Sequence, residues 1–492
     1  MRAKLLVAAA AAAAAVAIGL ALFHETGVAG GSRPNVVVVM TDDQDPASVG
    51  VMKAVEHELA ARGVTFANNY ATTPDCCPSR ASFETGQYAH NHGVLTRHPP
   101  RGGYQGFAAQ PALIKNALPV ALQDAGYRTG YIGKYLNGYG IPDYGGLRSP
   151  GIRRYIPPGW DRWYVPVDHT EYDMYGYRLN ENGRLRTYGT APRDYQTDVY
   201  ARKAQAFVRA SASQPQPFFL TVAPLAPHLE NPIAPGPRER GRNPRPALRD
   251  LGRFARRPLP RPPSFNERKI SDKPSFVRNT PRLSNSEIRQ LRLEYHSRLE
   301  SLLAVDDLVR GLVHQLRATG ELDNTYIVFT SDNGFMLGQH RRHGKLSVYE
   351  ESVRVPLIIR GPGLPARQVR SQLTANIDLA PTILDAASTP PRLEMDGISL
   401  LPGARDPAAD ANRSLVLEYL AGHRAYSAVR TADGFAYVEY RDGERELYDL
   451  NTDPYELHNL AGKPADAALE LDLARHLAAL RNCAGKSCDS PG

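Results

Sequence analysis

The sequence predicts an α/β fold with a large, mostly parallel central sheet and a smaller antiparallel sheet near the C-terminus. Two patterns support this prediction: short apolar runs that end in polar loop residues, and a change to short strands with tight turns after about residue 390. The composition agrees, because 42% hydrophobic and 22% charged residues in a chain of 492, with a mean hydropathy of -0.40, are typical of a soluble globular protein. Disordered, collagenous and polytopic membrane classes are therefore excluded.

Four apolar runs are expected to form buried parallel strands. The first, NVVVVM at 35–40, is apolar after its first residue, which favours a strand covered on both faces. The others lie at 127–132, 218–222 and 325–330. Ligands in open α/β sheets bind beyond the carboxyl ends of strands, so the loops that follow these runs are expected to meet at one site. These loops carry Asp42, Asp43, Lys134, His228, Asp332 and Asn333.

Helical spacing of apolar residues predicts a long helix from about 286 to 319, with Ser284 and Glu287 as a capping box. After about residue 390, four short strands are expected, followed by an amphipathic helix at 465–480; the strands are 414–419, 425–431, 435–440 and 446–449. The chain is therefore expected to divide into a main domain, 34–389, and a C-terminal subdomain, 390–492.

The N-terminus has the pattern of an export signal. Arg2 and Lys4 precede an apolar run at 5–23, and small residues follow around Gly30. We expect residues 1–30 to be removed; the alternative is a run retained as an anchor, since about 18 apolar residues can span a bilayer. Both place the protein outside the cell, either secreted or held at the outer face of the membrane. In that oxidising environment, Cys483 and Cys488 could close a small disulfide.

The excess of positive charge belongs to one segment. The chain has a formal net charge of +8. Between Pro237 and Arg282, fourteen basic residues face four acidic ones, which leaves the rest of the chain close to neutral. This Pro/Arg-rich segment, 237–282, is interpreted as a solvated surface loop or as a place that holds an anionic substrate or polymer. A nucleic-acid-binding fold is not implied.

The most informative segment is CCPSRASFETGQ at 76–87. Pro78 is suited to the start of a helix, whose N-terminal N–H groups would face the Cys76 side chain, and Arg80 adds a positive charge. This environment favours a nucleophile at Cys76. For a bare pair such as Cys76 and Cys77, the alternative is two inert or disulfide-linked cysteines.

This segment resembles the signature of type I sulfatases, in which the leading cysteine is converted to formylglycine. The signature is Cys, any residue, Pro, Ser, Arg, and then Thr85-Gly86. The resemblance extends from Asn35 to about Leu460. It implies an alkaline-phosphatase-like sandwich fold, a catalytic domain at 34–389 and a formylglycine-generating enzyme as a partner. Cys76 would be the modified residue.

The resemblance also implies a divalent cation, calcium with magnesium as the alternative, held by Asp42, Asp43, Asp332 and Asn333 together with the modified residue 76. The chemistry is consistent, because hard oxygen ligands suit calcium or magnesium and the sequence has no His/Cys cluster of the zinc type.

A sulfate ester gains negative charge on its oxygens and leaving group during transfer, and fixed cations must face that charge. By resemblance, Lys134 and Lys345 contact the sulfate, Arg80 orients the formylglycine, and His228 contacts the substrate and moves a proton. The implied reaction is in-line attack on sulfur by one hydroxyl of the hydrated aldehyde, with departure of the substrate alcohol. Deprotonation of the second hydroxyl, with His228 as the candidate base, then expels sulfate.

Three further runs resemble a subgroup that contains N-acetylglucosamine-6-sulfatases and heparan sulfate 6-O-endosulfatases; they are GKYLNGYG from Gly133, PPGWDRW at 157–163 and SDKPSFVR at 271–278. A sulfated amino sugar or glycan is the implied substrate. Leu136 departs from the histidine that many sulfatases have two residues after the lysine, so assistance to the leaving group is expected either from elsewhere or from His228 in a double role. Further candidate carbohydrate contacts are His90, Asn91, His92, His340 and His343.

Two alternatives remain at this point. The same scaffold and metal site also serve hydrolysis of phosphonate or phosphate esters in a related superfamily. A protein left unmodified at Cys76 would instead bind polyanions through the Arg-rich segment, without turnover and with strong sensitivity to salt.

Overall fold

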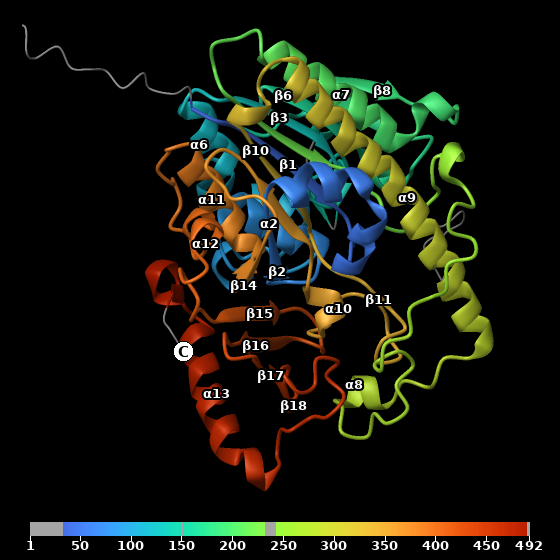
Figure 1. Ribbon diagram of the computed structural model, residues 1–492, viewed down its shortest axis with the longest axis vertical. Coiled ribbons are helices and arrows are strands. Elements are labelled where there is room, and N and C mark those ends of the chain that lie inside the picture. Colours follow the sequence, from blue (N-terminus) through green and yellow to red (C-terminus); the bar gives the residue numbers. More distant parts are fainter. Residues whose placement is uncertain (1–32, 145, 149–150, 232–242, 490–492) are drawn as a thin grey trace, which may run out of the picture. The chain divides into compact units, whose positions relative to one another are not determined.

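The computed structural model describes residues 33–144, 146–148, 151–231 and 243–489, and the chain from Pro34 onward forms one compact unit (Figure 1). The expected export signal, 1–30, and the first part of the basic segment, 237–242, lie outside the described residues. Within the described ranges, none of the helices is long and apolar enough to cross a membrane.

The central sheet has ten strands in the order β14-β2-β13-β10-β1-β9-β3-β6-β7-β8. Its five middle strands, from β10 to β6, run parallel to one another, whereas β13 and β7 run antiparallel to them, so the sheet is mixed and mostly parallel, as predicted. The strands are β1 Asn35–Thr41, β2 Val64–Tyr70, β3 Arg128–Gly133, β6 Arg162–Pro166, β7 Arg178–Glu181, β8 Arg184–Thr187, β9 Phe218–Ala223, β10 Thr325–Ser331, β13 Leu357–Arg360 and β14 Gln368–Ala375.

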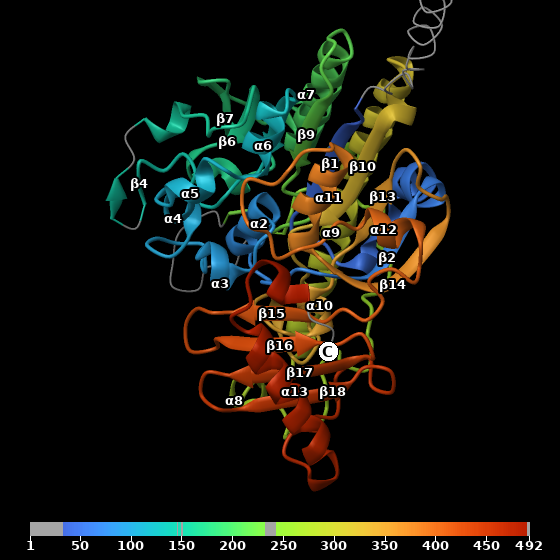
Figure 2. The ribbon, with the colours of Figure 1, turned by 90° about the vertical axis from the view of Figure 1, so that its left-hand side faces the viewer.

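Strand β1 is covered on both faces, as its apolar run predicts. Val36 and Val38 belong to one hydrophobic cluster, and Val37 and Val39 belong to another. Successive side chains of a strand point to opposite faces, so β1 separates two cores. The first core packs against α2 (Cys76–Thr85), α6 (Leu118–Asp124) and α11 (Leu379–Ala386), and the second against α7 (Gln196–Ser211) and α9 (Asn285–Ala318) (Figures 1 and 2).

The long predicted helix is α9, and it begins as the sequence indicates. The Ser284 hydroxyl accepts a hydrogen bond from the Glu287 backbone, and the Glu287 carboxylate accepts one from the Ser284 backbone. Shorter elements complete the main part of the chain: α3 Ala89–His92, α4 Gly103–Ala108, α5 Pro111–Ile114, α8 Ser275–Arg278, α10 Glu350–Val353, α12 Leu401–Arg405, β4 Asp143–Tyr144, β5 Leu147–Arg148, β11 Met336–Leu337 and β12 His343–Gly344.

The C-terminal part forms the predicted antiparallel sheet of four strands in sequence order, covered by the helix α13 (Ala467–Leu480). The strands are β15 Leu415–Tyr419, β16 Tyr426–Arg430, β17 Phe435–Tyr440 and β18 Arg445–Asp449. A disulfide joins Cys483 and Cys488, the pair that the sequence indicates, with the sulfurs 2.05 Å apart. The boundary at 390 stays a prediction.

The helix that carries the cysteine motif begins earlier than expected. We expected Pro78 to begin it, but α2 begins at Cys76. Asp75 precedes the helix in extended conformation, and its Oδ1 accepts a hydrogen bond from the Cys76 N–H at 3.1 Å. Pro78 then occupies the third helical position, where a missing N–H costs little because the first four N–H groups have no partner within the helix. Cys76 therefore lies in the first turn itself.

Candidate active site

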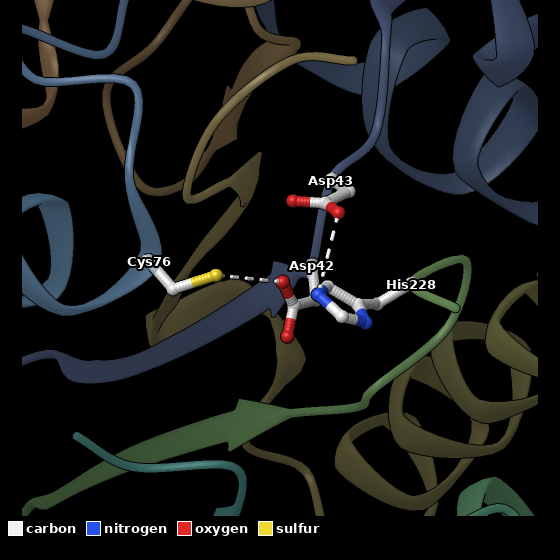
Figure 3. A group of neighbouring side chains, drawn as sticks. All are labelled: Asp42, Asp43, Cys76 and His228. Carbon is white, nitrogen blue, oxygen red and sulfur yellow. Dashed lines mark hydrogen bonds and ion pairs between the residues drawn. The ribbon is translucent and has the colours of Figure 1, made fainter. Parts of the chain in front are cut away.

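The predicted site residues meet at the carboxyl edge of the central sheet. Asp42 and Asp43 follow β1, Lys134 follows β3, His228 follows β9, and Asp332 and Asn333 follow β10; Cys76 and Arg80 come from α2, and Lys345 follows β12. Figure 3 shows the Asp42, Asp43, Cys76 and His228 side chains converging on one point. The ligand atoms of these four residues lie within 4.8 Å of one another.

Cys76 is fully buried among charged groups. Its Sγ lies 3.4 Å from Asp42 Oδ1, 3.2 Å from Lys134 Nζ and 2.6 Å from Lys345 Nζ. Burial first, and then the Asp42 carboxylate, raise the pKa of the thiol well above its ordinary range, against the opposite effect of the two lysines. The unmodified thiol is therefore protonated at neutral pH and is a weak nucleophile.

The two aspartates after β1 are ionised. Burial favours their neutral forms, but nearby cations, Lys134 first and then Arg80, act against it, and the pKa of Asp42 lies well below its usual value. The Lys345 ammonium, bonded to Asp43 Oδ1 at 2.5 Å, similarly lowers the pKa of Asp43 to about 2, although burial acts against it. The site thus keeps two adjacent buried carboxylates in their charged forms.

Arg80 and Lys134 are positioned by these carboxylates. Arg80 Nε donates to Asp332 Oδ2 at 2.9 Å, and its Nη1 donates to the Lys134 carbonyl at 2.7 Å. Lys134 Nζ lies 2.5 Å from Asp42 Oδ2 and 4.5 Å from the centroid of the Tyr172 ring. Arg80 therefore connects the cysteine helix to the loops after β3 and β10, and Lys134 presents its charge beside Cys76.

His228 faces the same carboxylates. Its Nε2 lies 3.5 Å from Asp43 Oδ2, and its Nδ1 lies 2.6 Å from the Leu229 carbonyl. Burial is the largest effect on this ring and lowers the pKa of His228, against the opposite effect of Asp43 and Asp42. A neutral imidazole that donates from Nδ1 keeps a lone pair on Nε2 toward the site.

The donor set fits a hard divalent cation. Asp42, Asp43 and Asp332 are all buried, and the amide oxygen of Asn333 lies beside them, 3.3 Å from Lys345 Nζ. Asp43 Oδ2 has no hydrogen-bond partner although it is buried. Oxygen ligands of this kind suit calcium or magnesium, and the buried Asp43 Oδ2 could accept such an ion.

Asp43, His228 and Lys345 open onto a cavity of about 1590 Å³. Its lining combines cations with acids. The cations include Arg97, Arg342 and Arg424, and the acids include Glu171, Glu287 and Glu294. A cavity with both kinds of charge fits a ligand that carries anionic groups and also hydroxyl or amide groups.

Sequence patterns did not identify three residues of the site. Arg298 of α9 donates hydrogen bonds to the Asp43 carbonyl and, at 3.2 Å, to the Pro227 carbonyl. It therefore links the loop after β1 to the loop after β9. Tyr172 lies under Lys134, and burial raises the pKa of its neighbour Glu171 to about 8. A buried arginine on the apolar face of α9 was the one available signal; nothing local distinguishes Glu171 or Tyr172.

The five additional carbohydrate candidates separate into two groups. His92 is buried and bonded to Ser82 Oγ at 3.0 Å, His340 is buried against Glu267 at 2.7 Å, and His90 and Asn91 bond to the Cys483 carbonyl at 3.0 and 2.8 Å. These four have internal partners. His343 instead lines the cavity, next to Glu294 at 2.8 Å.

Leu136 is fully buried and takes no part in the polar site. The next residue, Asn137, lines the cavity and donates from Nδ2 to the Tyr172 hydroxyl at 2.5 Å. The loop after β3 therefore turns a polar side chain toward the cavity one position later than the family pattern implies.

Comparison with known proteins finds sulfatases as relatives of this chain. The Sulfatase family model matches residues 34–389, and a model described as N-sulphoglucosamine sulphohydrolase, C-terminal, matches residues 338–483. Human N-acetylglucosamine-6-sulfatase is 36% identical over 510 residues, which cover 95% of this chain and 88% of that protein. The extracellular sulfatase SULF-1 homolog of Drosophila melanogaster is 38% identical over 376 residues, which cover 75% of this chain and 31% of that protein.

Among solved structures, BT4656 in complex with its substrate D-glucosamine-2-N,6-O-disulfate is similar along nearly the whole chain. It shares 26% sequence identity with a TM-score of 0.74, over 91% of this chain and 97% of that chain.

Proposed function

Because the chain belongs to the sulfatase family, and is thus a sulfuric ester hydrolase, we propose that it removes sulfate from a sulfated amino sugar, free or within a glycan. We propose further that it acts through a formylglycine made from Cys76 and a bound divalent cation. One observation carries the proposal: Cys76 lies buried between two ammonium groups and a carboxylate, and one of those ammonium groups, Lys345, lines a cavity large enough for a sugar.

The state of Cys76 supports its modification. A thiol whose pKa is raised by burial stays protonated, so the unmodified residue lacks the thiolate that attack on sulfur requires. A formylglycine at this position would supply a hydrated aldehyde, which offers one hydroxyl for attack and a second for release of the sulfate. Helix α2 places this residue in its first turn, where backbone N–H groups favour negative charge.

Asp42, Asp43, Asp332 and Asn333 would hold the cation, calcium or alternatively magnesium. When bound, it would supply a Lewis acid beside residue 76. The pKa values of Asp42 and Asp43 lie below their usual value, so both carboxylates are ionised at neutral pH, as metal ligands must be.

The remaining side chains bind and orient the ester. Lys134 and Lys345 both reach residue 76, so their charges face any sulfate held there. Arg80 positions Lys134 and Asp332 through its two hydrogen bonds. His228 presents Nε2 at the cavity and is the group that would take a proton in one step and return it in the other.

The amino-sugar assignment rests on the relatives. Human N-acetylglucosamine-6-sulfatase is similar over most of its length, and BT4656 has a disulfated glucosamine as its substrate. The mixed charges of the cavity agree with such a ligand, because sulfate requires cations while amide and hydroxyl groups bond to carboxyl groups.

The decisive experiment is the mass of the peptide that contains residue 76, from protein exported by its native host, measured together with turnover of N-acetylglucosamine 6-sulfate. Conversion of cysteine to formylglycine removes the sulfur, so the two forms differ in mass. We expect formylglycine and release of sulfate. Unmodified cysteine in protein that does not turn over would exclude the proposal and favour a polyanion-binding protein.

A phosphate monoester of the same sugar is the control for the alternative chemistry, and hydrolysis of the phosphate ester faster than the sulfate ester would assign the site to phosphoryl transfer.

We also propose that the protein is exported, and the N-terminus of the exported protein tests whether it is secreted or held at the outer face of the membrane. A start near residue 31 would indicate removal of the export signal, and an intact N-terminus would indicate a retained anchor.

A further inference from the structure

A second groove, lined mainly by basic residues, lies away from the candidate active site. Its volume is about 600 Å³. Arg128, which lines it, begins β3, whereas Lys134 of the active site follows the end of the same strand. A strand rises about 3.3 Å per residue, so the two side chains are separated by about 20 Å along the sheet. The groove is therefore at the opposite edge of the sheet from Cys76.

Six cations line this basic groove, and they come from five elements. Arg128 and Arg162 begin β3 and β6, Arg186 is in β8, Arg193 is in the short helix η6 (Pro192–Asp194), and Arg202 and Lys203 are in α7. Figure 1 shows β3, β6, β8 and α7 in the same part of the molecule. Packing of the chain, rather than a local run of charge, brings these cations together.

The cations are held in place without being neutralised. Arg128 Nη1 donates to the Ala210 carbonyl at 2.7 Å, Arg162 Nη1 to the Asp161 carbonyl at 2.8 Å, and Arg202 Nη2 to the Arg193 carbonyl at 2.5 Å. A neutral carbonyl orients a guanidinium but leaves its charge available.

The acids near the groove are fewer than the cations. Lys203 pairs with Glu181 at 2.9 Å, which is the one ion pair that the six cations make within the described ranges. Asp194 also lines the groove, and its Oδ2 accepts a hydrogen bond from the Gly189 N–H at 3.2 Å. Asp161 also acts on Arg128, so six cations face three carboxylates, which leaves net positive charge in a concave surface, where field lines are focused.

Like charges crowd one another in this groove. Burial lowers the pKa of Lys203, and the neighbouring charges of Arg186 and Arg202 act in the same direction, against Glu181. Burial and the charge of Arg162 lower the pKa of Arg128. An anion in the groove would relieve this repulsion.

Aromatic rings lie between the cations. Lys203 Nζ is 4.5 Å from the centroid of the Tyr164 ring, and Arg186 Cζ is 5.0 Å from the centroid of the Tyr188 ring. Both tyrosines line the groove, so it offers flat apolar surface as well as positive charge. A sugar chain that carries sulfate groups has the complementary features: apolar ring faces and repeated negative charge.

We propose that the basic groove binds a sulfated glycan chain, as an anchoring site separate from the active site. The choice of a glycan rests on the proposed function, because a sulfated sugar is the proposed substrate. The groove would hold part of a polymer while another part, or another chain, enters the cavity at Cys76. It contributes affinity for long substrates and leaves the chemistry on short ones unchanged.

The test compares two double variants that lose the same charge. Arg186→Gln with Arg202→Gln alters the groove; Arg253→Gln with Arg256→Gln alters two exposed arginines of the basic segment that do not line it. Binding of an end-labelled heparin-derived oligosaccharide is measured by fluorescence anisotropy at about 0.15 M salt, where exposed charges separated by more than about 8 Å are screened. Cys76→Ala is added to every protein so that the ligand is not consumed.

We expect the groove variant to bind about tenfold more weakly and with a shallower dependence on salt, because fewer counterions are released. The control variant should stay within about twofold of the parent, since its charges lie outside the groove. The chemically desulfated oligosaccharide should not bind. Equal losses in both variants would overturn the inference, because general charge would then account for binding.

Single-stranded DNA of matched charge serves as a competitor. If it displaces the oligosaccharide with equal affinity, the assignment to a sulfated glycan is wrong.

Turnover of N-acetylglucosamine 6-sulfate, measured with Cys76 intact, separates the two proposals. We expect unchanged kcat/KM in the groove variant. A wild-type enzyme with no such turnover would contradict the proposed function, whereas normal turnover with unaltered oligosaccharide binding in the groove variant would contradict this inference alone.

Discussion

At the scale of single residues, the site depends on buried charges that compensate one another. Lys345 bonds to Asp43, Lys134 pairs with Asp42, and Arg80 bonds to Asp332, so three carboxylates each have a cation. Removing one partner of such a buried pair leaves an uncompensated charge, which costs about 3–5 kcal/mol. The same groups surround Cys76, and substitutions here are therefore expected to affect stability as well as catalysis.

Replacing Cys76 with serine tests the need for a second hydroxyl. The variant Cys76→Ser supplies one hydroxyl in the same surroundings, so it should accept sulfate once and then stall. Intact mass spectrometry should detect one added sulfate group per chain, with no continuing release. Cys76→Ala is the control and should acquire none. Multiple turnover by the serine variant would contradict the proposed role of residue 76.

Glu84 provides a prediction of pH dependence that does not involve the reaction. It is buried in α2, and burial raises its pKa to about 8 from an ordinary value of 4.5. Because the folded state keeps this proton and the unfolded state releases it, the stability that this group contributes is largest below about pH 4.5 and falls as pH rises toward 8. The slope from this group is about 1.4 kcal/mol per pH unit.

Glu84→Gln removes that titration. We expect the variant to become progressively more stable than the wild type between pH 5 and pH 8 in urea unfolding, with little difference at the acidic end. The comparison is made between the two proteins at each pH, so carboxylates elsewhere cancel. A difference that does not change with pH would show that Glu84 is ionised in the folded protein.

At the scale of elements, α9 connects the second hydrophobic core to the active site. Its apolar face packs against α7, and Arg298 on the same helix bonds to the carbonyls of Asp43 and Pro227. One helix thus supports both the loop after β1 and the loop that carries His228. Its N-terminal cap lies more than three turns before Arg298, so the two contributions can be separated experimentally.

Ser284→Ala removes the cap of α9. We expect a loss of about 1 kcal/mol in the free energy of unfolding, because the Glu287 N–H loses its acceptor, and no change in kcat/KM. Ser284→Asp, which retains a capping oxygen, should recover most of the stability. A loss of activity beyond the fraction unfolded would show that the start of α9 also positions the site.

At the scale of the whole molecule, the family model and the relatives identify the chain as a sulfatase, a sulfuric ester hydrolase. The mixed ten-stranded sheet and the C-terminal sheet confirm the predicted alkaline-phosphatase-like arrangement. The active site draws on loops that extend from Asp42 to Lys345, so the local order of the site depends on the folding of most of the chain. Conversely, a ligand that binds this site only in the folded state must stabilise the whole unit.

Metal removal tests that link. Treatment of the purified enzyme with a chelator should lower Tm and abolish sulfate release, and calcium should restore both, because an ion that binds only the folded state stabilises it. Asp43→Asn is the matched control: its Tm should respond less to the chelator. An unchanged Tm and full activity after verified removal of divalent ions would contradict the cation assignment.

The sequence alone determined the features that depend on local pattern. The apolar run of β1 predicts burial on both faces because no polar side chain interrupts it, and the polar residues after β1, β3, β9 and β10 indicate a shared edge. The motif from Cys76 to Gly86 is specific because six residue types occur together at fixed spacing. The start of α9 was predictable because its capping box is local in sequence.

Only the tertiary structure decided the features that require distant segments to meet. It brought Arg298 to the active-site loops, and it gathered six cations from five elements into the basic groove. Periodicity and spacing describe residues that are neighbours along the chain. These contacts instead join residues that are separated by tens to hundreds of positions. Only the packing of the sheet and its helices brings such residues together.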